Sequence, residues 1–296
     1  MKKLLLFAFA ITTILCFVSC GTNNSSQEND LPTDNLNQAI DSASSINSIS
    51  YTTNYEQILK SDTDTTTTIS IVENKRMKEP FVMWSKTVLQ TNGQTNHTIE
   101  FYQKASENGL ESSVRGADTE WNIGSPSVDQ TQVQKYIDHT NNYIEAFCYL
   151  LNANLDSFKM DNNQDGLIKY NGTISQSSIV ETYKQFDRDF YIYQGLIQSE
   201  NKISDSEILK EITSGKINEL MVGIPSLAFA DKPIPITVWV NEKDNTIAKV
   251  QIDETNANQA IMKLGEKNGE MRKVEKSILT YKVIGINTFD EIPMPE

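Results

Sequence analysis

The stretch "PITVWVNEKDNTIAKVQID", residues 235–253, alternates apolar and polar side chains on both sides of a short polar connection, "NEKDN". The apolar positions before and after that connection are Ile236, Val238, Val240, Ala248, Val250 and Ile252. Side chains at every second position of a β-strand lie on one face of the sheet. The stretch therefore predicts an antiparallel hairpin, and its apolar face has to be covered by a second layer.

The same two-residue period extends the predicted sheet in both directions along the chain. Segments rich in Thr, Ile, Tyr and other aromatic residues predict strands at 48–59, 65–76, 81–90, 97–106 and 274–289, with a further hairpin at 110–123. The dipeptide Asn92-Gly93 lies between two of these strands and is a strong signal for a two-residue hairpin turn. Residues 48–123 therefore predict an antiparallel meander.

Other segments have apolar residues at helical spacing. Helices are predicted at 35–47, 127–155, 175–197 and 204–213, and a short helix or a long loop at 256–269. Asp129 is expected to cap the second of these helices, and Ser204 with Glu207 the fourth. The order helix, meander, helices, hairpin and final strand predicts an α+β fold, with an antiparallel sheet and helices on one of its faces.

The N-terminus has the pattern of a lipoprotein signal peptide, predicted here over residues 1–19. Two lysines precede an apolar run from Leu4 to Phe17, and the run ends in "FVSCG". This ending resembles the lipobox of bacterial lipoproteins, in which the cysteine thiol, here Cys20, receives a diacylglycerol (palmitate-type) anchor. An ordinary secretory peptide and an uncleaved anchor are the alternatives for this segment.

Residues 20–34 are rich in Asn, Ser and Asp and lack aromatic residues, so they predict a flexible polar tether. Residues 35–296 are then expected to form one domain. Two acyl chains hold a protein stably at a membrane, which predicts a lipid-anchored protein at the extracytoplasmic face of the cell membrane. Without residues 1–19 the chain has 24 basic and 39 acidic residues, a net charge of −15. This balance argues against nucleic acid as a partner.

Together with the lipobox and the tether, the 235–253 hairpin resembles the LolA/LppX superfamily of bacterial lipoproteins. In that superfamily a Trp-containing strand, an Asp/Asn-Lys turn and a second strand recur. The matching residues here are Trp239, Val240, Asn241, Ala248 and Lys249, with Asn-Glu-Lys in place of the usual turn. The resemblance implies a curved, unclosed β-half-barrel whose concave face is packed with helices, and in some members a lipid or another apolar ligand bound between the two layers.

Two functions remain open at this stage. The first is a binding protein for a lipid or other apolar molecule, with a cavity lined by aromatic residues in predicted strands: Phe81, Trp84, Phe101, Trp121, Trp239 and Tyr281. The second is a surface module that recognises an envelope protein or peptide, with no small-molecule ligand. No grouping of residues predicts catalysis, and no cofactor is implied, so an enzyme is not expected.

The stretch "DNNQDGLIKYNG", residues 161–172, begins like a calcium-binding EF-hand loop. Asp161, Asn163, Asp165 and Gly166 occupy the first half of that pattern, but position 12 is Gly172 instead of a bidentate glutamate. The same residue types favour hairpin turns. The sequence therefore predicts a turn without a metal, and a weak calcium site is the alternative.

The remaining titratable residues give little chemistry. His97 and His139 are expected at the surface, and neither has metal-ligand spacing. Asp187 and Asp189 flank Arg188 and are expected on the solvated face of a helix. Cys148 has no partner left for an internal disulfide and is expected in the core.

Overall fold

The computed structural model describes residues 33–126, 129–194, 204–213, 224–265 and 272–295. The predicted signal peptide and most of the predicted tether lie outside these residues. The first described helix begins at Asp34, one residue before the predicted domain boundary.

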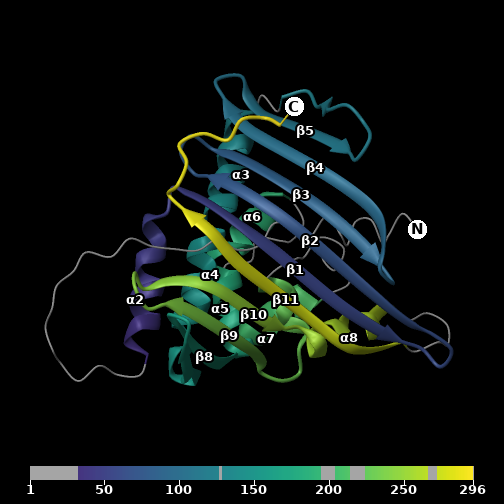
Figure 1. The fold of residues 1–296 in the computed structure, drawn as a ribbon, viewed down its shortest axis with the longest axis vertical. Helices are drawn as coiled ribbons and strands as arrows, with labels where there is room; N and C mark the ends of the chain where they lie inside the picture. The colour runs from purple at the N-terminus through teal and green to yellow at the C-terminus, as the bar shows by residue number, and fades with distance from the viewer. Residues whose placement is uncertain (1–32, 127–128, 195–203, 214–223, 266–271, 296) are drawn as a thin grey trace, which may run out of the picture.

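One open antiparallel sheet of eleven strands forms the body of the protein, in the order β6-β5-β4-β3-β2-β1-β11-β10-β9-β8-β7 (Figure 1). The strands are β1 (Ser48–Lys60), β2 (Thr65–Met77), β3 (Val82–Thr91), β4 (Gln94–Ser106), β5 (Gly109–Gly116), β6 (Asn122–Ile123), β7 (Lys159–Gln164), β8 (Leu167–Ile174), β9 (Ile234–Asn241), β10 (Thr246–Asp253) and β11 (Lys273–Ile286). The sheet confirms the predicted α+β class and the curved, unclosed architecture.

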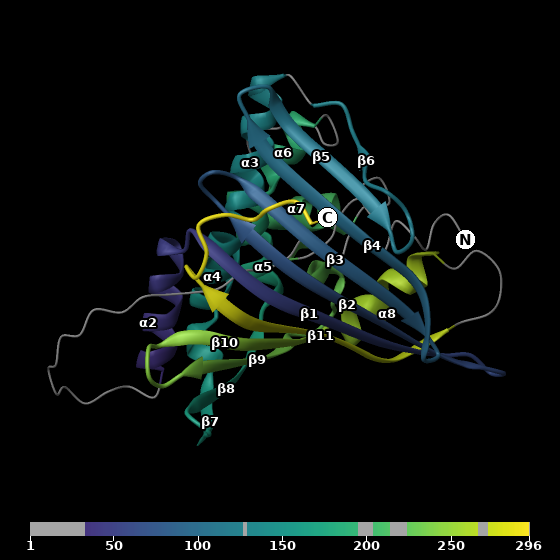
Figure 2. The same cartoon turned by 45° about the horizontal axis from the view of Figure 1, so that its top comes forward.

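The helices gather on one face of this sheet, called here the inner face, as both views show (Figures 1 and 2). They are α2 (Asp34–Ser42), α3 (Gln130–Asn141), α4 (Tyr143–Asn152), α5 (Gln176–Phe186), α6 (Arg188–Tyr193), α7 (Asp205–Thr213) and α8 (Thr255–Gly265), with the 3-10 turns η2 (Ala43–Ser45), η3 (Leu155–Ser157) and η4 (Ile224–Phe229). The opposite face, called the outer face, carries no helix among the described residues.

The first and last strands are neighbours in the middle of the sheet. β1 pairs with β11 along almost its whole length, for example Thr53 opposite Tyr281 and Tyr55 opposite Leu279. This pairing joins the meander β1–β6 to the hairpins β7–β8 and β9–β10. The two halves therefore share one continuous inner face.

The hairpin that predicted the fold forms β9 and β10, with a bulge that the alternation did not indicate. Val250 lies opposite Val238, but the register shifts between Ile247 and Lys249. Ile247 is consequently buried, and the prediction that Ala248 shares the apolar face was wrong. An extra residue in one strand reverses the facing of the residues before it.

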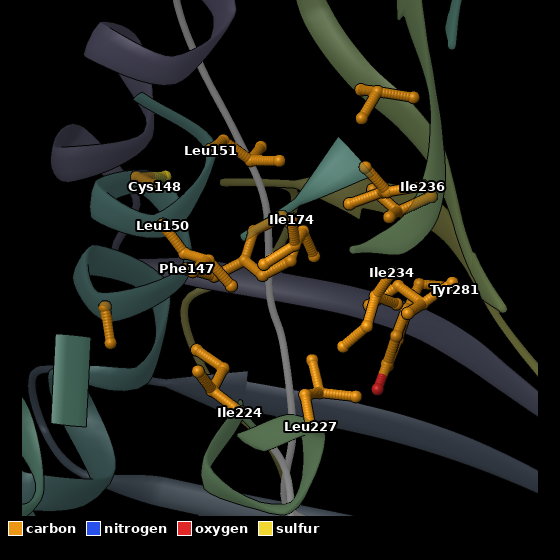
Figure 3. Packing of buried hydrophobic residues seen from close by; sticks show 14 of the residues in the cluster. Phe147, Cys148, Leu150, Leu151, Ile174, Ile224, Leu227, Ile234, Ile236 and Tyr281 are labelled. Carbon is orange, nitrogen blue, oxygen red and sulfur yellow. The ribbon is translucent and has the colours of Figure 1, made fainter. Parts of the chain in front are cut away.

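The inner face is filled by packed side chains (Figure 3). Phe147, Leu150 and Leu151 of α4 point towards the sheet, and Val238 and Val240 of β9 belong to the same fully buried cluster. Both predicted helix caps are present, since Asp129 accepts a hydrogen bond from the Gln132 amide, and Ser204 donates from its amide and its hydroxyl to the Glu207 carboxylate.

The residues that follow β11, 287–295, are called the C-terminal segment and lie over the outer face of β2, β3 and β4 (Figure 2). Ile292 is buried there against Met77 and Val82, and Phe289 and Met294 pack around them. The two edge strands differ: β6 has two residues, and β7 is exposed throughout, with a register shift after Met160.

We predict that Gly172→Ala destabilises the protein. Gly172 faces inward on β8, and a Cβ there would lie 2.7 Å from Cδ1 of Phe158, which is itself buried. Overpacking of this kind costs about 1–3 kcal/mol of unfolding free energy. Chemical denaturation measures the loss.

Gly116→Ala is the matched control, because its Cβ would meet Thr119 Oγ1 at 3.4 Å, an ordinary contact. Equal stability of the two variants would contradict the packing of Phe158 on β8.

Candidate functional site

Three of the six predicted cavity aromatics lie on the inner face, in two separate places. Phe81 and Phe101 pack with Val133 of α3, and the Phe81 ring meets Tyr136 edge-on at 6.5 Å between centroids. Tyr281 lies in the main core and is almost fully buried. These three residues pack the sheet against the helices.

Two more lie on the outer face beneath the C-terminal segment. Trp121 donates a hydrogen bond from Nε1 to the Pro295 carbonyl at 2.9 Å, and Trp84 packs in the same cluster. Tyr102 donates from its hydroxyl to the Ile292 carbonyl at 3.2 Å. The six aromatics are therefore divided between two faces and do not together line one space.

The sixth, Trp239, lies on the outer face of the other half, within a row of side chains that crosses the sheet. Facing residues on neighbouring antiparallel strands share a face, and the register joins nine of them. From β8 to β5 they are Lys169, Trp239, Lys249, Lys282, Thr52, Glu73, Lys86, Glu100 and Arg115.

On β2 to β5 the charges of this row alternate in sign. The Glu100 carboxylate lies 3.2 Å from Arg115 Nη2 and 4.0 Å from Lys86 Nζ. It also accepts a hydrogen bond from Trp84 Nε1 at 3.3 Å. This half of the row is internally compensated.

On β8 to β11 the row is positive, and its residues Lys169, Trp239, Lys249 and Lys282 are called the lysine patch. Lys249 Nζ lies 4.1 Å from the Trp239 ring centroid. Burial lowers the pKa of Lys249, and the charges of Lys282 and Lys169 lower it further. A local excess of positive charge therefore exists in a chain whose net charge is −13.

The predicted turn in residues 161–166 is confirmed. Asp165 and Gly166 both have positive φ and join β7 to β8, as a two-residue hairpin requires. The Asp161 carboxylate is bound by Lys169 Nζ at 2.6 Å and by Asn171 at 3.2 Å, and these hydrogen bonds lower its pKa. Within the part of the chain that the structure describes, no three acidic, His or Cys side chains are placed to hold a metal.

His139 and Asp187 correct a prediction, because both are buried. His139 Nε2 lies 3.0 Å from Asp187 Oδ1, and its ring stacks on Phe190 at 3.9 Å. Burial raises the pKa of Asp187, while His139 opposes that rise. The pair joins α3 to the start of α6. Its sequence signal is the helical spacing of His139, three residues after Tyr136 and four before Tyr143. His97 is exposed, as predicted.

A second polar cluster lies where α8 meets β1 and β11. Asn258 donates to Ser277 Oγ at 2.9 Å and to the Glu254 carboxylate at 3.3 Å, and Ser277 donates to the Tyr55 hydroxyl at 3.0 Å. Burial raises the pKa of Glu254 to about 7, against the hydrogen bond from Asn258. Burial, followed by the charge of Glu254, raises the pKa of Tyr55. No local sequence pattern predicted this cluster, whose residues come from separate segments of the chain.

Comparisons with known proteins assign no family. No family model matches the chain, and no curated protein matches it. A solved structure that matches is a beta-barrel-like protein of domain of unknown function DUF1849 from Brucella abortus, at 7% identity and a TM-score of 0.23, covering 83% of this chain and all of that one. None of the helices in the described residues is long and apolar enough to cross a membrane.

We predict that Glu254→Gln makes the folded protein more stable than the wild type above neutral pH, because glutamine cannot ionise. A carboxyl whose pKa is higher in the folded state stabilises the fold while protonated, below its unfolded pKa, and that contribution disappears as pH rises through about 7. The midpoint of thermal unfolding should therefore exceed that of the wild type at about pH 8 and match it near about pH 4.

The control for this measurement is Glu107→Gln, a change at an exposed residue in the β4–β5 turn. Its unfolding midpoint should follow the wild type across the pH range. If the unfolding midpoints of Glu254→Gln and the wild type depended on pH in the same way, folding would not raise the pKa of the Glu254 carboxyl, which would contradict the prediction.

Proposed function

We propose that this chain is a lipid-anchored, extracytoplasmic binding protein that contacts its partner through the outer face of its sheet. The observation that carries this proposal is the difference between the two faces. The inner face is covered by helices and filled with buried apolar residues. The outer face of β8 to β11 presents Trp239 and lysines.

The N-terminal sequence supports the anchored location. The Lys-Lys start, the apolar run and Cys20 in "VSCG" suit attachment of a diacylglycerol, and residues 20–34 suit a tether. Without residues 1–19 the chain has a net charge of −15 and is repelled by an anionic membrane surface, so the lipid alone would hold it there.

Binding of a lipid or other apolar molecule between sheet and helices is the function that the LolA/LppX resemblance implies. Such a ligand would have to displace side chains such as Phe147 of α4 and Val238 of β9. Both are fully buried in the core between the helices and the sheet. Displacing well-packed core residues is costly, so the outer face is the better-supported binding surface.

Cys20 should carry the lipid. Metabolic labelling with a clickable fatty acid should label the wild-type protein, and Cys20→Ala should abolish both the label and the membrane association, because two acyl chains provide the stable attachment. Cys148→Ala is the control, since this thiol is buried, and it should keep the label. An unlabelled wild-type protein would refute the anchor.

The outer face should be the contact surface on intact cells. A photo-reactive residue in place of Gln251, on the outer face of β10, should give covalent adducts several-fold more often than one in place of Gln185, which is exposed on α5. Electrophoresis of the anchored protein after irradiation measures the adducts.

Equal adduct yields at the two positions would contradict the assignment to the outer face. Native mass spectrometry of the full-length protein in mild detergent separates the other function. A bound mass that is lost on organic extraction would favour an apolar ligand in the interior, and the unliganded mass is the expected result.

A further inference from the structure

We propose that the lysine patch binds a phosphate-bearing polymer of the cell envelope, laid across strands β8 to β11. This inference rests on the proposed function of the outer face and names the chemistry of its ligand. The patch consists of Lys169, Trp239, Lys249 and Lys282, which face one another in sequence across four neighbouring strands.

The arrangement places like charges directly opposite each other. Lys249 and Lys282 are register partners on β10 and β11, an arrangement that destabilises a sheet. In the described part of the chain, no carboxylate lies within 4 Å of either nitrogen, whereas Lys169 is paired with Asp161. These two cations therefore have no carboxylate partner among the described residues, and an anionic ligand would supply one.

The surroundings of the patch suit an anion that also accepts hydrogen bonds. The neighbouring outer-face row lies two residues from the patch on each of the four strands. It contains Asn171, Thr237, Gln251 and Thr280. All four carry amide or hydroxyl donors and none carries a charge. Thr237 already donates to Asn171 at 3.0 Å, which orients the Asn171 amide nitrogen towards Asp161.

Geometry favours a linear ligand over a membrane surface. Neighbouring strands are about 4.8 Å apart, so the row from Lys169 to Lys282 extends over roughly 14 Å in a line. A membrane surface would also meet the acidic remainder of the chain, whose net charge is −15 without residues 1–19. A chain that crosses only the patch avoids most of that charge, since charges beyond about 8 Å are screened at physiological salt.

Trp239 orients the patch and does not offer a stacking surface for bases. Lys249 Nζ lies over its ring at 4.1 Å, and Lys169 faces it from β8. Binding of single-stranded nucleic acid depends on aromatic rings that are free to stack with bases. The ligand is therefore recognised by its phosphate groups. Their binding beside Trp239 should change the fluorescence of this tryptophan.

The experiment uses the full-length protein in non-ionic detergent, with inorganic polyphosphate as the probe. Titration should change the tryptophan fluorescence of the wild type, and Trp239→Phe should remove that change. Lys249→Gln with Lys282→Gln should weaken binding about tenfold, at roughly threefold per exposed ion pair. The slope of log K against log salt should fall by about two.

Lys86→Gln is the matched control, because Lys86 lies in the same cross-strand row on β3 but outside the patch, beside Glu100. It should bind polyphosphate like the wild type. The Lys249/Lys282 variant should unfold at the same temperature as the wild type or higher, because the like-charge pair is relieved. Weaker binding with an intact fold therefore reports on the patch.

Equal weakening by Lys86→Gln would overturn the proposal, since binding would then follow overall charge. Stronger binding to phosphatidylglycerol vesicles than to polyphosphate would also overturn it, in favour of a lipid surface. Orthophosphate should bind more weakly than the polymer, which presents several equivalent groups, and equal binding would remove the polymer from the proposal. If polyphosphate fails but Gln251 still forms adducts on cells, the outer face binds a different ligand, and only this inference falls.

Discussion

The pairing of the first strand with the last is the constraint on which the molecule depends. β1 and β11 lie more than two hundred residues apart in sequence, yet they hold the two halves of the sheet together through matched registers such as Tyr55 with Leu279. Until that pairing forms, the meander and the C-terminal hairpin each expose half of an apolar face. Contacts between residues so far apart in sequence form slowly, because closing the long intervening loop costs conformational entropy. The largest buried cluster then forms where the helices pack on β1 and on β8 to β11, and α3 packs separately against β3 to β5.

The alternation and turn signals predicted most of the strands, because period, Asn92-Gly93 and Asp165-Gly166 are local properties of the chain. Register is a different matter, since it is set by pairing between distant segments. The bulge at Ala248 and the cross-strand row around Trp239 both arise from register. The side-chain alternation itself excluded Trp239 from the inner face, because this residue lies between Val238 and Val240, and the period that places those valines inside places the tryptophan outside. His139 and Asp187 were misplaced because helix–helix packing, and not composition, buried them.

The two faces of the sheet differ in the residues that they carry and in what covers them. Apolar residues and hydrogen-bonded polar clusters occupy the inner face, where α4, α5 and α8 pack against the strands. The outer face is itself divided. The C-terminal segment covers β2 to β4 and accepts hydrogen bonds from Trp121 and Tyr102. That cover ends before β8 to β11, where the lysine patch lies. Binding through this half would leave the helical layer and its buried pairs undisturbed.

An unclosed sheet has two borders, and their character decides how the protein behaves among its own copies. Free backbone donors and acceptors along a strand invite a second chain to dock and start a fibre. Here one border is cut to two residues, and the other is irregular and carries lysine, asparagine and glutamine side chains into water. Among the described residues, neither border is a long, regular strand with a continuous row of apolar side chains. These features of the two edge strands reduce edge-to-edge pairing between copies, although the sheet is not closed into a barrel.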